Sequence, residues 1–130
     1  MIYGISATFA RPFDEVLDDV RQALAGQGFG VVSEVDMQAT LRAKLGVEID
    51  PQLILGACNP SFARRALEAE PSIGLLLPCN VVVRGTPDGV VVEMINPQTL
   101  VQLTGNAQLQ EISAELMERL QSAMATLRGA

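Results

Sequence analysis

Two valine-rich runs, at residues 81–84 and 90–95, are separated by Gly85-Thr86-Pro87-Asp88-Gly89. Pro, Asp and Gly are favoured in tight turns, and β-branched runs on both sides of such a turn predict a β-hairpin. The two strands of a hairpin are antiparallel neighbours. The chain is therefore expected to contain at least one antiparallel strand pair.

The rest of the chain alternates between short apolar runs and segments with helical periodicity. Further strands are expected at residues 2–9, 29–35 and 53–57, with another strand-like apolar run at 73–77. Helices are expected from Pro12 to about Gly26, at 36–45, at 60–70, as a short turn from Asn96-Pro97 to Gly105, and at 107–127. Asp36 and Asn59 precede two of these helices and are favoured N-cap residues.

This order predicts a single domain over residues 1–130 with a two-layer α+β fold. The alternation of strands and helices also permits a partly parallel, mixed α/β sheet. Helices on one face of the sheet would leave the other face in need of cover, and a second copy of the chain could supply that cover. A homodimer is therefore expected.

Composition narrows the function. The formal charge is −6 and the nine Lys and Arg residues are scattered, so the chain lacks the basic surface that nucleic acid and anionic membranes require. Histidine is absent, which excludes Ser-His-Asp and Cys-His catalysis. The start of the chain lacks the pattern of a signal peptide, and no apolar run is long enough to span a bilayer. Two cysteines then indicate free thiols in a cytoplasmic protein.

The same dipeptide occurs twice, as Cys58-Asn59 and Cys79-Asn80. Cys58 comes just before the helix expected at 60–70, where the helix dipole and nearby Arg64 and Arg65 would favour a thiolate. The alternative is that Cys58 is a small buried side chain at a tight junction.

A shared site would have to bring Cys79 close to Cys58 in space. Two thiols could form a redox pair, carry a persulfide or hold a soft metal such as Cu(I), although their spacing matches no tight metal-ligand motif. Asn59 and Asn80 are better explained as residues that cap helices and form turns than as residues that contact a ligand. We therefore assign no metal and no cofactor from the sequence.

Three segments together resemble one known family. They are Glu34-Val35-Asp36 with Lys44-Leu45-Gly46, then Ile54-Leu55-Gly56-Ala57-Cys58-Asn59-Pro60, then Ile73-Gly74-Leu75-Leu76-Leu77-Pro78-Cys79-Asn80-Val81-Val82-Val83. Their order and amino-acid sequences resemble the bacterial and archaeal family called domain of unknown function 302, over roughly residues 29 to 96. The resemblance implies a curved, mostly antiparallel sheet with helices packed on one face, and a homodimer. It implies no activity.

Two functional hypotheses follow. In the first, Cys58, Asn59, Cys79 and Asn80 form a thiol-based site for redox chemistry, sulfur transfer or soft-metal handling. In the second, the protein is a non-catalytic homodimeric module that binds a small apolar ligand or a protein partner. The sequence leaves open whether the protein is an enzyme.

Overall fold

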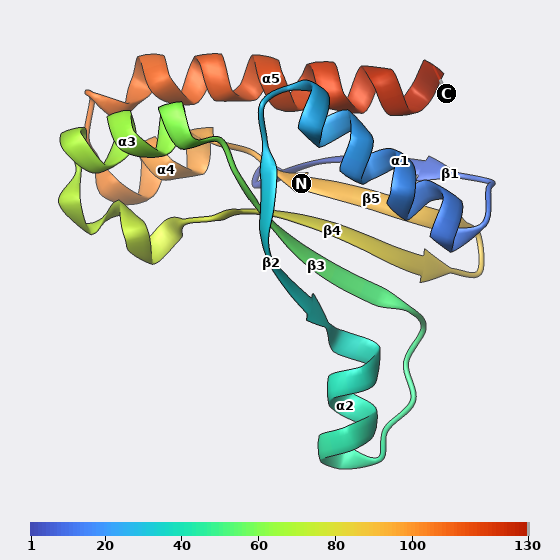
Figure 1. The fold of residues 1–130 in the computed structure, drawn as a ribbon. Helices are drawn as coiled ribbons and strands as arrows, with labels where there is room; N and C mark the ends of the chain where they lie inside the picture. Colours follow the sequence, from blue (N-terminus) through green and yellow to red (C-terminus); the bar gives the residue numbers. More distant parts are fainter. Residues whose placement is uncertain (130) are drawn as a thin grey trace.

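The computed structural model describes residues 1–129 (Figure 1). The strands are β1 (Gly4–Phe9), β2 (Gly30–Asp36), β3 (Gln52–Cys58), β4 (Cys79–Thr86) and β5 (Gly89–Ile95). The helices are α1 (Phe13–Gly26), α2 (Met37–Leu45), α3 (Pro60–Ala69), the 3₁₀ helix η1 (Pro71–Leu76), α4 (Gln98–Thr104) and α5 (Leu109–Gly129).

The strands form one five-stranded sheet in the order β1-β5-β4-β3-β2. Every neighbouring pair is antiparallel, so the α+β prediction is confirmed and the partly parallel alternative is wrong. The expected hairpin is β4–β5, in which Thr86 pairs with Gly89 across the two-residue turn Pro87-Asp88.

Strand register assigns the side chains of the central strands to two faces. Val81 and Val83 of β4 pair with Met94 and Val92 of β5, and all four side chains are buried. Side chains at the intervening positions, such as Val82, lie on the opposite face, because successive residues of a strand alternate between faces. The sheet therefore has one face that contributes to the core and one that is more open.

Helices α1 and α5 pack against each other over the buried face (Figure 1). Helix α5 presents an apolar stripe to the core, and all of its members are buried: Leu109, Ile112, Leu116, Leu120, Met124 and Leu127. Helix α1 ends at Gly26, and Gly28 follows with a φ of 83°, a conformation that favours glycine.

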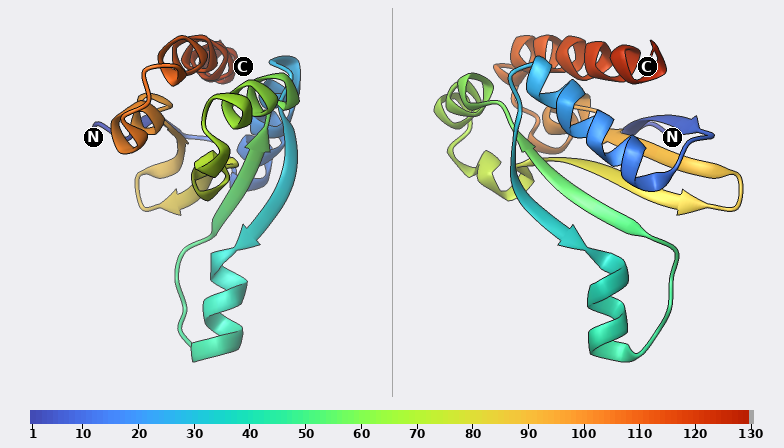
Figure 2. Two further views of the ribbon diagram at one scale, coloured as in Figure 1. Left: turned by 90° about the vertical axis from the view of Figure 1, so that its left-hand side faces the viewer. Right: turned by 45° about the vertical axis from the view of Figure 1, so that its right-hand side comes forward.

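The ends of β2 and β3 extend beyond this body and carry α2, which points away from the sheet in each view (Figures 1 and 2). We call residues 35–51, which include α2, the arm. The predicted cap of α2 is confirmed, since the carboxylate of Asp36 accepts a hydrogen bond of 2.9 Å from the backbone N–H of Ala39. None of the side chains of α2 is buried. The arm is thus locally well formed but makes little contact with the core.

One strand-like run is not a strand. Most of residues 73–77 belong to η1, which begins at Pro71. Proline lacks the N–H that a strand ladder needs and fits the first turn of a helix. Ile73 is fully buried, whereas Leu75 is 88% exposed. The apolar run therefore contributes only part of its surface to the core.

Candidate functional site

A cavity of about 340 Å³ lies where the ends of β3 and β4 meet α3, η1 and α5. Its lining is aliphatic and aromatic, with two thiols and one amide as its only polar side chains. The residues that line it are Phe29, Val32, Ala57, Cys58, Asn59, Phe62, Ala63, Ala66, Leu67, Gly74, Leu77, Pro78, Cys79, Leu100, Ile112 and Leu116. No charged side chain belongs to this lining.

Both cysteines line this cavity and both are free thiols. Cys79 pairs directly with Ala57 across the β3–β4 ladder, so Cys58 is only one position further along β3. Cys58 is half-buried and Cys79 is buried. Both cysteines thus contribute to one cavity lining, although strand alternation starts their side chains on opposite faces of the sheet.

The surroundings of Cys79 disfavour its thiolate. Burial, and secondarily the proximity of Cys58, raises the pKa of the Cys79 thiol to about 11. A thiol in this state is protonated at neutral pH and is a weak nucleophile. Cys79 is therefore suited to pack or to donate a weak hydrogen bond.

The two asparagines differ in position. Asn59 lies at the N-cap position of α3, but its side chain makes no capping hydrogen bond. Its amide instead donates a hydrogen bond of 3.2 Å to the backbone carbonyl of Gln27. Asn80 pairs with Gly56 and lies outside the cavity, so the structure brings together three of the four predicted site residues and not the fourth.

The expected cationic influence on Cys58 is also reduced. Arg64 forms an ion pair of 3.1 Å with Glu68, and Arg65 forms one of 2.5 Å with Glu115. Each guanidinium is thus already neutralised by a carboxylate. The prediction that these arginines favour a thiolate has lost its main support.

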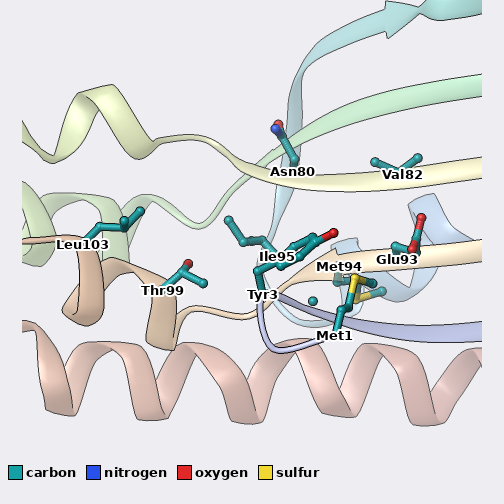
Figure 3. A pocket seen from close by; sticks show the side chains of 10 residues that line it. Met1, Tyr3, Asn80, Val82, Glu93, Met94, Ile95, Thr99 and Leu103 are labelled. Atoms are coloured by element: carbon teal, nitrogen blue, oxygen red, sulfur yellow. The ribbon is translucent and has the colours of Figure 1, made fainter.

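A second hollow, of about 400 Å³, lies on the open face of the sheet near the N-terminus (Figure 3). Asn80 and Val82 come from β4, Thr99 and Leu103 from α4, and Tyr3 from the segment before β1. Tyr3 is 64% exposed and Leu103 is 71% exposed, so apolar surface is open to solvent here. This hollow is more open to solvent than the thiol-lined cavity.

The sequence did not single out most of the residues that line either hollow. Phe29, Phe62 and Leu116 look like ordinary core residues, since each falls on an apolar position of its strand or helix. They become a cavity lining only because α3, η1 and α5 leave space between them. No local pattern in the chain marks such a space.

Two searches of the described residues are informative. Within residues 1–129, no three Cys, Asp or Glu side chains gather into a group able to hold a metal ion. Over the same residues, none of the helices has the length and hydropathy to cross a membrane.

Comparison with known proteins places the chain in a family. The model of DUF302, a domain of unknown function, matches residues 5–127. A similar solved structure is that of an uncharacterized conserved protein, DUF302, from Bacillus stearothermophilus. It is 26% identical in sequence, with a TM-score of 0.90 over 98% of this chain and 99% of that chain. No curated protein matches. This chain belongs to the DUF302 family.

Proposed function

We propose that this protein is a binding module that holds a small, uncharged, apolar ligand in the thiol-lined cavity. The observation that carries the proposal is the lining itself, which is almost wholly apolar and contains no charged side chain. The volume of about 340 Å³ lies within the range of about 300–1,000 Å³ typical of small-molecule sites. A charged ligand would lose its hydration here without gaining a partner.

A binding role fits this lining better than catalysis. The cavity offers no carboxylate, amine or imidazole that could move a proton. Its buried thiol is held protonated by the raised pKa of Cys79. The side chains that remain can enclose a ligand and orient it weakly, which is what a carrier or sensor domain requires.

A neutral fluorescent probe such as N-phenylnaphthylamine tests the proposal, because its emission rises on transfer from water to an apolar site. We expect saturable binding to the wild type and weaker binding to Ala66→Leu, which adds apolar volume inside the cavity. Ala63→Leu serves as a second filling variant if Ala66→Leu is poorly folded. Arg64→Leu is the matched control, because it adds apolar volume on the exposed side of α3. Equal binding by the filling variants and this control would refute the proposal.

Thiol chemistry is the second candidate, and the observation in its favour is that Cys58 and Cys79 line one cavity. A redox pair would need both thiols to react at neutral pH. Alkylation of the Cys58→Ser and Cys79→Ser variants over a range of pH measures each thiol separately. Rapid alkylation of both thiols at neutral pH would favour redox chemistry over simple ligand binding.

We also propose that two copies associate through the arm. Helix α2 has nine residues and buries none of them, and a helix that short is marginal without packing partners. Val35, Leu45 and Val47 are exposed large apolar residues of this arm. Arg42 is already paired with Glu48 inside the arm, through two hydrogen bonds of 2.9 Å, so the exposed apolar residues carry this proposal.

Light scattering after gel filtration tests this association. The wild type is expected to be a dimer, and Leu45→Glu combined with Val47→Glu should yield a monomer. Leu67→Glu is the control, since Leu67 is also exposed but lies on α3. A monomeric wild type at tens of micromolar would contradict the proposal.

Two unpaired thiols fit a reducing compartment, and we accordingly propose a cytoplasmic location.

A further inference from the structure

We propose that Cys58 is a covalent modification site for uncharged α,β-unsaturated carbonyl compounds that carry an apolar tail. This inference rests on the proposed function, since the cavity must first bind the compound. It adds the chemical class of one ligand and the atom that captures it. The cavity lining, the different exposure of the two thiols and the absence of charged groups all support it.

The lining determines the body of the ligand. Phe62 and Ala66 of α3 and Leu116 of α5 line a cavity that has no charged side chain. An alkyl or alkenyl tail gains free energy for each methylene that it buries there. A carboxylate or ammonium group would gain no partner in the cavity. The ligand is therefore neutral and apolar over most of its surface.

Exposure distinguishes the two thiols. Cys58 is half-buried, so a reagent that enters from solvent can reach it. Cys79 is only 5% exposed, lines the same cavity and makes no hydrogen bond within residues 1–129. Burial raises the pKa of Cys79, which keeps this thiol as a weak hydrogen-bond donor for a carbonyl oxygen. Cys58 is therefore the nucleophile, and the buried Cys79 thiol is the hydrogen-bond donor for the carbonyl oxygen of the ligand.

The missing groups determine the type of reaction. The cavity supplies no general base and no donor set for an expelled leaving group. Conjugate addition expels no leaving group, and solvent can accept the proton of the Cys58 thiol. The sulfur of Cys58 forms a bond to the β-carbon of the ligand, and the π bond of the alkene breaks to give an enolate. The proton released by the thiol, carried through solvent, ends on the α-carbon. The adduct contains all atoms of both reactants, and no oxidant or reductant takes part.

Nonenal and crotonaldehyde form a suitable reagent pair, because they share the reactive group and differ in their apolar tails. The rate of adduct formation is measured by intact mass, mapped by peptide analysis, and divided by the rate of each reagent with glutathione. We expect this normalised rate at Cys58 to be about tenfold or more higher for nonenal, since the cavity binds its tail beside the thiol. Saturated nonanal should slow the reaction by competition.

Three variants identify the sulfur atom that forms the adduct. Cys58→Ser should lose the cysteine adduct, Cys79→Ser should keep it at Cys58, and Ala66→Leu should reduce the advantage of nonenal. Equal normalised rates for the two reagents, or an adduct that maps to Cys79 in the wild type, would overturn the inference. Reversible binding of N-phenylnaphthylamine separates the two proposals. Probe binding without a nonenal advantage refutes only the covalent site, whereas loss of both refutes the binding function as well.

Discussion

The side-chain amide of Asn59 is a hydrogen-bond donor to the backbone carbonyl of Gln27, at 3.2 Å, and so joins the start of α3 to the end of α1. The two residues are 32 positions apart in the chain. The bond passes close to Gly28, where an added Cβ would lie 3.1 Å from the Asn59 amide nitrogen. This contact, and not a helix cap, defines the role of the first asparagine.

Replacing Asn59 with Asp tests that role. Asp is as good an N-cap residue as Asn, so a capping role predicts little change in stability. A carboxylate cannot donate to Gln27 and would place two acceptors face to face. We expect Asn59→Asp to lower the free energy of unfolding by about 1–3 kcal/mol in urea denaturation. A variant as stable as the wild type would restore the capping interpretation.

Gly56 of β3 has no room for a side chain, because Ser33 and Pro78 lie where its Cβ would be. A Cβ built there would lie 2.1 Å from the Oγ of Ser33 and 2.6 Å from the Cγ of Pro78. The proline ring cannot turn aside. Gly56→Ala is therefore expected to cost about 2 kcal/mol or more of stability. Gly30→Ala is the matched strand control, because a Cβ at Gly30 meets nothing within 4 Å, and equal losses in the two variants would exclude the steric explanation.

The buried thiol should make stability depend on alkaline pH. Folding raises the pKa of Cys79 from 9.0 to about 11, so between these values the folded chain retains a proton that the unfolded chain has lost. Stability from this group is complete below about pH 9 and falls as pH rises towards 11. This pKa difference corresponds to a loss of at most about 3 kcal/mol.

Denaturant unfolding of wild type and Cys79→Ala at about pH 8 and about pH 10.5 measures this loss. Both proteins share every other titrating group, so the pH dependence that the variant lacks belongs to Cys79. Parallel curves for the two proteins would show that the thiol titrates equally in the folded and unfolded states.

The arm should be dispensable for folding of the body. Asp36 and Leu53 are direct partners across the β2–β3 ladder, so Asn-Gly in place of residues 37–52 would close a two-residue hairpin. The deletion also removes the Gln52–Arg84 pair and the hydrogen bond from the Gly85 N–H to the Pro51 carbonyl. Because α2 itself buries no side chain, we expect the stability of the monomer to fall by only about 1–2 kcal/mol. Leu55→Ala, which empties a fully buried position, should cost about 2–5 kcal/mol by comparison.

Circular dichroism and thermal unfolding of the shortened chain check this expectation, and gel filtration of the same sample reports on association. A shortened chain that fails to fold would mean that the arm supports the core in a way that its exposure does not reveal. A folded monomer would support both the independence of the body and the proposed role of the arm in dimerisation.

Local patterns accounted for most of the elements. The turn at Pro87-Asp88 defined a hairpin, and helical spacing placed the buried stripe of α5, because turn chemistry and periodicity depend on neighbours in the chain. Residues 73–77 were misjudged, since a short apolar run looks the same in a buried strand and in a single turn of helix. Pro71 is the local clue, because proline fits the first turn of a new helix as well as the end of the preceding one.

The site was harder to predict than the fold. The repeated Cys-Asn dipeptide directed attention to Cys58 and Cys79, which line one cavity. It also grouped Asn80 with them, whereas strand alternation puts Asn80 on the opposite face from its neighbour Cys79. The partner of Asn59 and the ion pairs of Arg64 and Arg65 depend on where distant helices pack. Those contacts depend on the tertiary arrangement, which cannot be predicted from the spacing of residues along the chain.

The strand order joins the first strand of the chain to the last, since β1 pairs with β5, and α1 packs against α5. During synthesis the ribosome releases β1 and α1 before their partners β5 and α5, which emerge only after β2, β3 and β4. The apolar stripe of α1, which includes Val16, Val20 and Leu24, must therefore wait uncovered on the nascent chain. The β1–β5 pairing and the α1–α5 contact therefore form only after β5 and α5 have left the exit tunnel.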